Sequence, residues 1–109
     1  MRIIVFFDIP VKTPIQRKLA VQFRNYLLND GFIMLQYSVY SRIIKGESSA
    51  IKHTQKIHEN TRRIQQEAPV DSNIRVLTIT EKQYGSMLFI TGDKKPEEKR
   101  LTYEQLLLL

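Results

Sequence analysis

The sequence lacks cysteine and lacks any apolar run long enough to cross a bilayer. Without cysteine, neither a disulfide nor a thiolate zinc site can hold the chain together. The N-terminus shows no basic region followed by an apolar stretch and a small-residue cleavage site. No apolar segment approaches the roughly 18–20 residues that a transmembrane helix needs. We therefore expect a soluble, cytoplasmic protein that does not associate with membranes.

The common catalytic signatures are also missing. The chain has no glycine-rich phosphate loop, no serine or cysteine nucleophile beside a base, and no H-E-x-x-H motif. Its two histidines, His53 and His58, lie five residues apart on a predicted helix and point roughly 140° away from each other. They cannot share a metal ion, so we predict structural or surface roles for both.

Positive charge is concentrated in the first half of the chain. The 109 residues, enough for one domain with a single core, carry a net charge of +6. Residues 1–46 hold seven Lys/Arg against two acids (+5), residues 47–68 four against three (+1), and residues 69–109 six against six (0). This bias favours a polyanionic partner such as nucleic acid, with general solubility charge as the alternative explanation.

The first ten residues predict a buried strand that ends in a carboxylate. Five consecutive apolar residues, Ile3 to Phe7, are β-branched or aromatic and are typical of a strand buried on both faces. Asp8 follows, and Pro10 stops the strand because it has no N–H to donate. A carboxylate at the mouth of a buried strand needs solvent, a partner or a metal. The alternative is that Asp8 only begins a turn or caps the next helix.

A helix is predicted directly after this strand. Thr13 is a suitable N-cap, Pro14 suits the first helical position, and Gln16 completes a capping box. Asn29-Asp30-Gly31 ends the helix. Its apolar positions recur every four residues, at Ile15, Leu19, Phe23 and Leu27. On the opposite side Arg17 and Arg24, seven residues apart, fall within about 20° of each other.

The remaining pattern alternates between extended and helical segments. Residues 32–44 are an unusually long extended segment, and residues 50–68 predict a second helix that Pro69 ends. Its apolar or small positions are Ile51, Thr54, Ile57, Thr61, Ile64 and Ala68. Residues 73–80 predict the third strand and residues 87–91 the fourth.

We interpret this as an α+β fold with the ferredoxin-like order β-α-β-β-α-β: four antiparallel strands with two helices on one face. The domain spans residues 1–93, and residues 94–109 form a charged linker and a C-terminal tail strand. Two helices leave the other sheet face open, which favours a homodimer. The tail, which ends in four leucines, is expected to pair with a sheet edge or dock on another protein.

A two-fold dimer would also complete a metal site. If the first strands approach the dimer axis, two copies of Asp8 face each other across it. Two close carboxylates repel, so a divalent cation between them is stabilising, and Mg²⁺ accepts one or two carboxylates together with waters and phosphate. Such an ion polarises a phosphodiester and lowers the pKa of its bound water.

Several motifs resemble the family of small CRISPR-associated proteins numbered two, the dimeric subunit of the spacer-acquisition machinery. They are Ile4-Val5-Phe6-Phe7-Asp8-Ile9-Pro10, Gln16-Arg17-Lys18, Gly31-Phe32, and Gln36-Tyr37-Ser38-Val39-Tyr40-Ser41-Arg42. The stretch Leu77-Thr78-Ile79-Thr80-Glu81-Lys82-Gln83 resembles the members that accompany single-effector, Cas9-type systems. In this order the motifs span essentially the whole chain.

The resemblance implies a ferredoxin-like homodimer placed between two dimers of an integrase subunit, in a heterohexamer that holds duplex DNA for insertion into the CRISPR array. It also implies a metal-dependent endonuclease of RNA or DNA, with Asp8 as the catalytic Mg²⁺ ligand. Arg17 and Lys18 match the basic pair at the start of the first helix, and Arg42 matches the arginine after the second-strand motif. The tail from Lys99 onward would dock the integrase.

Two functions therefore compete. We favour a DNA-binding scaffold for spacer integration, because one acid per subunit with no obvious general base is a thin catalytic constellation. The predicted phosphate contacts are Lys12, Arg17, Lys18, Arg24, Arg42 and Lys45, and they would be sequence-independent and salt-sensitive. The alternative is a nuclease that acts independently of the integrase through paired Asp8. An RNA-binding module is less suited, because residues 73–80 contain no aromatic residue for stacking a base. A small ligand-binding domain would not need the basic bias.

Overall fold

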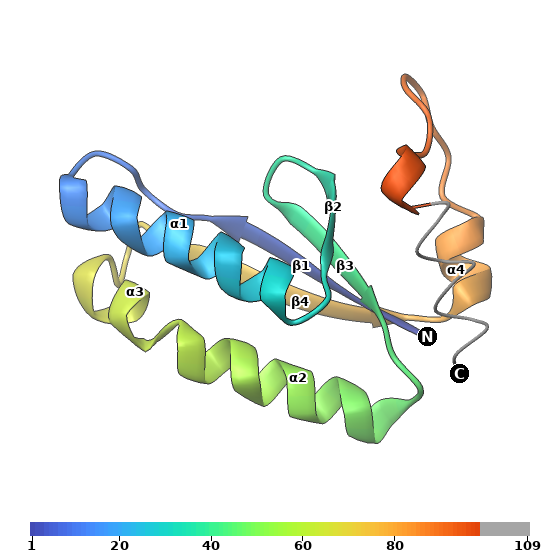
Figure 1. Cartoon of the computed structure of the whole chain (residues 1–109), viewed down its shortest axis with the longest axis horizontal. Helices are drawn as coiled ribbons and strands as arrows, with labels where there is room; N and C mark the ends of the chain where they lie inside the picture. The colour runs from blue at the N-terminus through green and yellow to red at the C-terminus, as the bar shows by residue number, and fades with distance from the viewer. Residues whose placement is uncertain (99–109) are drawn as a thin grey trace.

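The computed structural model describes residues 1–98 (Figure 1). The elements, in chain order, are β1 (Arg2–Asp8), α1 (Pro14–Asn29), β2 (Ile33–Gln36), β3 (Val39–Ile43), α2 (Glu47–Asn60), α3 (Arg62–Glu67), β4 (Asn73–Ile79) and α4 (Glu81–Gly85). Neighbouring strands are antiparallel and follow the order β2-β3-β1-β4. The predicted tail strand at residues 99–109 lies outside the described residues.

The predicted ferredoxin-like arrangement is confirmed. The helices α1, α2 and α3 cover one face of the sheet, and β1 runs through its middle between β3 and β4 (Figure 1). Ile3 and Val5 are fully buried beneath the helices, and Ile4 on the opposite face is 5% exposed. The five-residue apolar run therefore predicted the central strand correctly. Within residues 1–98, no helix is long and apolar enough to cross a membrane.

The strands are not all where the sequence placed them. Residues 32–44 form a hairpin of two strands, β2 and β3, rather than one extended segment. Tyr37 and Ser38 make the turn. Ser38 adopts a positive φ of 65°, a conformation that a glycine in the sequence would usually mark. Because this hairpin supplies the fourth strand, the predicted strand at residues 87–91 is wrong: these residues carry no strand and are exposed.

The start of α1 was predicted from local chemistry and is confirmed. The Thr13 hydroxyl accepts the backbone N–H of Gln16 and the Gln16 side chain accepts that of Thr13, which completes the capping box. The helix ends before Gly31, whose φ of 91° is readily adopted only by glycine. Of the predicted apolar face, Leu19, Phe23 and Leu27 are buried, and Ile15 is exposed at the first turn.

The second predicted helix is divided in two. It begins at Glu47, earlier than expected, and breaks at Thr61, where the φ and ψ of −107° and 4° leave the helical region. The Thr61 hydroxyl donates to the backbone carbonyl of His58 at 2.9 Å, so a side chain takes over a bond that the helix would otherwise make. The predicted buried stripe is confirmed at Ile57, Thr61, Ile64 and Ala68. It is rotated in the first turns, where Ala50 and His53 are buried and Ile51 is 60% exposed.

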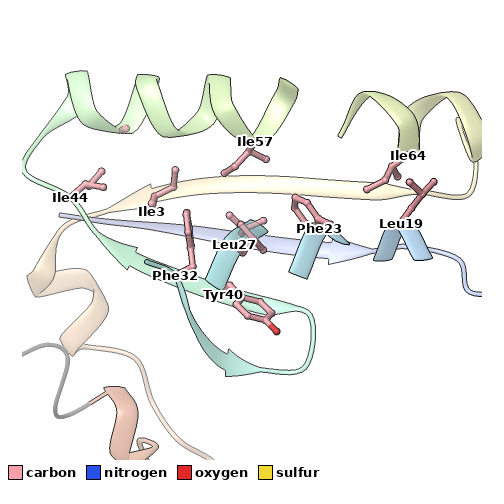
Figure 2. Close-up of a cluster of buried hydrophobic side chains, with 11 residues drawn as sticks. Ile3, Leu19, Phe23, Leu27, Phe32, Tyr40, Ile44, Ile57 and Ile64 are labelled. Carbon is pink, nitrogen blue, oxygen red and sulfur yellow. The ribbon is translucent and has the colours of Figure 1, made fainter. Parts of the chain in front are cut away.

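One hydrophobic core lies between the helices and the sheet. Figure 2 shows side chains from α1, α2, α3, β1 and β3 pointing toward one another, with Ile64 of α3 beside Leu19 of α1. Phe23 packs edge-on against Phe7 at 5.1 Å between ring centroids, and Phe7 stacks on Tyr40 at 5.6 Å. The core holds α1 antiparallel to β1, so the helix begins at the end of the sheet where Asp8 lies.

The opposite sheet face is only partly covered. We call it the open face; it presents Ile4, Phe6, Leu35, Val39 and Leu77. Phe6 is 38% and Leu77 50% exposed. Met87 and Phe89, from the segment that follows α4, approach this face and enclose a small apolar cavity of about 160 Å³ with it.

A buried arginine anchors this following segment. The Arg2 Nε donates to both Glu81 carboxylate oxygens at 3.0 and 3.1 Å, and its guanidinium lies 3.6 Å from the centre of the Tyr84 ring. The Tyr84 hydroxyl in turn donates to Glu98 at 2.6 Å. Burial and this hydrogen bond raise the pKa of Tyr84 above its ordinary value. The network packs residues up to Glu98, in the segment predicted as a linker, against the domain.

Candidate functional site

Asp8 lies exposed at the last pair of the β1 ladder, opposite Asn73 of β4. Side chains alternate along a strand, so the pattern places Asp8 on the side of Ile4 and Phe6, the open face. Because Asp8 ends the strand, it also lines a hollow on the side of α1. Phe7 belongs to the helix-covered face and packs in the core. In the described part of the chain, no hydrogen bond or ion pair engages the Asp8 carboxylate, so it is available to a ligand from solvent.

The loop after Asp8 is held rigidly by two side chains of α1. The Gln16 side-chain oxygen accepts the backbone N–H groups of Lys12 at 2.9 Å and Thr13 at 3.1 Å. The Arg17 Nη1 donates to the carbonyls of Val11 at 3.1 Å and Lys12 at 3.2 Å. Arg17, which the sequence assigned to phosphate binding, thus clamps the loop while its guanidinium remains exposed.

A hollow of about 360 Å³ opens beside this loop. It brings Asp8 together with Arg17, Arg24 and Ser38 over an apolar base that includes Phe7. Arg24 is exposed, and within residues 1–98 no hydrogen bond or ion pair engages its guanidinium. Burial raises the pKa of the Tyr40 hydroxyl, and the positive charge of Arg24 lowers it by a smaller amount. The spacing of seven residues therefore did predict two arginines on one flank of α1.

The six predicted phosphate contacts do not form one surface. Lys12, Arg17, Lys18 and Arg24 lie on the loop or on α1, toward the end of the sheet that carries Asp8. Lys45 follows β3, whose last residue pairs with Arg2 at the opposite end of β1. Of the six, the structure brings Arg17 and Arg24 into one hollow with the acid.

Arg42 and Lys45 are the two predicted cations that lie away from Asp8. The Arg42 side chain is hydrogen-bonded to the backbone of its own domain. Its Nε donates to the Asp30 backbone carbonyl at 2.6 Å and its Nη1 to the Ile43 carbonyl at 3.0 Å. The half-buried guanidinium also lies against Gly31, where an added Cβ would meet the Arg42 Nε at 3.2 Å. Arg42 ties β3 to the end of α1, so much of its hydrogen-bonding capacity is used within the fold.

The histidines occupy different environments, as predicted. His53 is buried, with its Nδ1 2.8 Å from an Asp30 carboxylate oxygen and its ring edge-on to Phe32. The Lys56 ammonium lies 3.9 Å from the other Asp30 oxygen. His58 is exposed and points elsewhere. Residues 1–98 contain no group of three or more His, Cys, Asp or Glu side chains placed to hold a metal ion.

Two functional candidates were missed by the sequence analysis. Arg62 and Arg63 begin α3 and line a second hollow, of about 390 Å³, between α1 and the junction of α2 and α3. Both are exposed. The adjacent Arg-Arg pair was visible in the sequence, but it lay in a region of nearly balanced charge. Only the packing of α3 beside α1 brings this pair to the basic helix.

The Asp8 carboxylate is a suitable ligand for a hard cation, but one carboxylate is too few to hold it. A solvent-exposed carboxylate at a rigid strand end is a suitable oxygen ligand for Mg²⁺, which retains several waters and takes phosphate oxygens. One chain offers one such carboxylate at this position. The residues therefore fit a magnesium ion only as a half-site, which a second copy or a bound phosphate would have to complete.

Comparisons with known proteins point to one family. A family model described as CRISPR associated protein Cas2 matches residues 1–87. A "CRISPR-associated endoribonuclease Cas2" from Acidovorax ebreus is 42% identical over 108 residues, 99% of each chain. One of the same name from Treponema denticola is 41% identical over 109 residues, the whole of both chains. A crystal structure of Streptococcus pyogenes Cas2 at pH 6.5 has the same fold: TM-score 0.60 at 14% identity, covering 84% of this chain and all of the other.

Proposed function

The chain belongs to the Cas2 family of CRISPR-associated proteins, and from that premise we propose that it is a DNA-binding scaffold subunit for spacer insertion. In this role a homodimer bridges two integrase dimers and holds duplex DNA as the fragment enters the CRISPR array. The observation that carries the proposal is the hollow that brings the exposed Arg17 and Arg24 together with a single acid, Asp8. Lys12 on the adjoining loop and Lys18 on α1 are exposed as well.

The charge at this end favours phosphate. No acidic residue occurs in α1, and its three cations are exposed. Exposed cations exert sequence-independent attraction on a polyanion and release its counterions on contact. The loop that carries Lys12 is held by Gln16 and Arg17, so less conformational entropy is lost when it contacts a phosphate.

The chemistry around Asp8 supports binding more than catalysis. A general base must reach the proton that it removes, and His53 is buried against Asp30 near the other end of α1. In residues 1–98, Asp8 is not part of any group of three or more His, Cys, Asp or Glu side chains placed to hold a metal ion. A single chain therefore presents a phosphate-binding surface with one carboxylate and no base.

The proposed homodimer uses the open face. Phe6 and Leu77 leave apolar surface exposed there, and Met87 and Phe89 add to it. Burying such surface against a second copy is favourable, and an isologous contact covers both copies at once. Asp8 belongs to this face, so the same contact would bring two Asp8 carboxylates toward one another. The tail from Lys99 remains the proposed docking segment for the integrase.

Two exposed cations provide the test. In the double variant Lys12→Gln/Arg24→Gln, we expect the slope of log K against log salt for a labelled DNA duplex to shrink by about 1.8, because each lost phosphate contact contributes about 0.9. The matched control, Lys52→Gln/Lys82→Gln, removes the same charge from exposed lysines on α2 and α4. Equal slopes for both variants would refute a phosphate surface at the Asp8 end.

The same pair of variants carries the test into cells. Spacer acquisition in cells with the complete system should fall with Lys12→Gln/Arg24→Gln and stay near wild type with the control. Sedimentation of Phe6→Glu should show loss of the dimer, and acquisition should fall with it. A dimer that persists in Phe6→Glu would show that the open face is not the interface.

A second candidate is a Mg²⁺-dependent nuclease of RNA or DNA that acts independently of the integrase; the relatives are named endoribonucleases. The Asp8 carboxylate favours it, since it is exposed and has no partner among residues 1–98. Two copies of Asp8 would hold the ion, which would supply charge stabilisation and a more acidic bound water. Asp8→Asn should abolish Mg²⁺-dependent cleavage in this case. Undiminished cleavage by Asp8→Asn would remove this candidate, and acquisition that survives the variant would leave the scaffold role.

A further inference from the structure

We propose that the hollow between α1 and the α2–α3 junction is a second binding site for the phosphodiester backbone, with Arg62 and Arg63 as its cations. This inference rests on the proposed DNA-binding function and extends it to residues that neither the sequence motifs nor the first hollow includes. The hollow measures about 390 Å³, which is within the range of small-ligand sites.

The two hollows lie on opposite flanks of one helix. Arg17 and Arg24 of α1 line the hollow that contains Asp8, whereas Gln22 and Tyr26 line the second one. Lys18 lies one turn before Gln22, so it belongs to the flank of α1 that carries Gln22. Helix α1 therefore presents cations on both of its flanks, and a nucleic-acid strand that crosses the helix would contact both hollows.

The position of α3 places Arg62 and Arg63 toward the end of the sheet that carries Asp8. Ile64 packs beside Leu19 in the first half of α1 (Figure 2), and Asn73, shortly after α3, pairs with Asp8. Arg62 and Arg63 thus lie toward the end of the molecule where Lys12 and Lys18 are exposed. Within residues 1–98, neither arginine side chain makes a hydrogen bond or an ion pair, so both guanidinium groups are available.

An unsatisfied hydroxyl lies beside the same hollow. The Tyr26 hydroxyl is buried and finds no hydrogen-bond partner among the described residues. Burial, with the nearby Asp30 and Glu59 charges, raises the pKa of Tyr26 to about 12, so the hydroxyl keeps its proton and is a donor. Buried polar groups in native structures nearly always have partners. A phosphate oxygen seated in the hollow is a suitable acceptor.

Two acids oppose the ligand, and one of them, Asp30, is paired with His53 and Lys56. Glu59 lines the hollow, and its carboxylate repels a phosphate. The two arginines outweigh the Glu59 charge by one, and Lys18 on the same flank of α1 adds a second positive charge. This gives a prediction of opposite sign for the acid: the variant Glu59→Gln should bind the backbone more tightly than the wild type does.

The test measures the affinity of the full-length protein for a short labelled duplex, DNA and RNA in parallel, over a series of salt concentrations. We expect Arg62→Gln/Arg63→Gln to reduce the salt slope by about 1.8, and the control Lys52→Gln/Lys82→Gln to leave it unchanged. Tyr26→Phe should weaken binding about three- to tenfold without changing the slope, because a hydrogen bond is lost but no charge. Glu59→Gln should strengthen binding.

The variants separate this proposal from the one on which it rests. If Lys12→Gln/Arg24→Gln lowers the slope and Arg62→Gln/Arg63→Gln matches the control, the second site is wrong and the DNA-binding function stands. If neither double variant differs from the control, both proposals fail. If Tyr26→Phe and Glu59→Gln bind as the wild type does while the arginine pair matters, the arginines act as surface charge and the hollow is not a site.

Discussion

Replacing Asp8 by asparagine changes the charge of the candidate site by one unit and little else. The side chain is exposed at the end of β1, and within residues 1–98 it makes no hydrogen bond or ion pair, so the fold should be unaffected. Asn is nearly isosteric with Asp. The variant therefore isolates the role of the carboxylate in DNA binding.

The magnitude follows from simple electrostatics. A carboxylate about 6 Å from a bound phosphate in water repels it by roughly 0.7 kcal/mol, which corresponds to about threefold in affinity. With EDTA at low salt, Asp8→Asn should thus bind a DNA duplex about threefold more tightly than the wild type. At about 1 M salt the Debye length is near 3 Å, so the difference should vanish.

Magnesium should reverse the sign if the carboxylate holds the ion. A cation between Asp8 and phosphate turns repulsion into attraction, so with Mg²⁺ the variant should bind more weakly than the wild type. Fluorescence anisotropy with EDTA and with Mg²⁺ measures both cases. Weaker binding of Asp8→Asn in EDTA would refute the reasoning, because it would give the carboxylate a favourable role that no charge argument provides.

Three further predictions concern the stability of the fold and its dependence on pH. Arg42→Gln should lower the free energy of unfolding by about 1–3 kcal/mol, because the Asp30 carbonyl loses a charged donor, and it should leave the salt slope of DNA binding unchanged; thermal unfolding and anisotropy check the two parts. Gly31→Ala should cost about 1–2 kcal/mol, since φ is 91° and the new Cβ meets Arg42, and chemical unfolding measures it. Tyr26 has its pKa raised to about 12 in the folded state, so its contribution to stability is complete below about pH 10 and is lost as pH rises toward 12. Tyr26→Phe should flatten this alkaline loss in unfolding experiments; an equally steep loss in the variant would contradict the assignment.

Several features could be predicted because neighbours in sequence produce them. The capping box of Thr13 and Gln16 forms within one turn, and Gly31 ends α1 by its own backbone freedom. The repeat of Leu19, Phe23 and Leu27 fixed the buried side of α1, and it thereby placed Arg17 and Arg24 on the other side. Such local rules require no knowledge of the partner elements.

Other features escaped the sequence because a competing contact decided them. The hairpin at residues 32–44 turns at Tyr37 and Ser38, residues that carry no strong turn signal, and its two strands are selected by pairing with each other and with β1. The break at Thr61 depends on a side-chain bond to the His58 carbonyl. The pattern of residues 87–91 is typical of a strand, yet within the described chain it has no strand partner.

The sequence by itself determined the central strand, the start and end of α1, and the single carboxylate at the end of β1, because backbone freedom, capping and apolar runs act over a few residues. Only the tertiary structure decided which cations share a surface. Arg42 is drawn to the Asp30 carbonyl twelve residues away, whereas Arg62 and Arg63 come beside α1 through the core contact of Ile64 with Leu19. Burial of apolar side chains sets these long-range positions, and a charged residue lies where the apolar packing of its helix or strand places it.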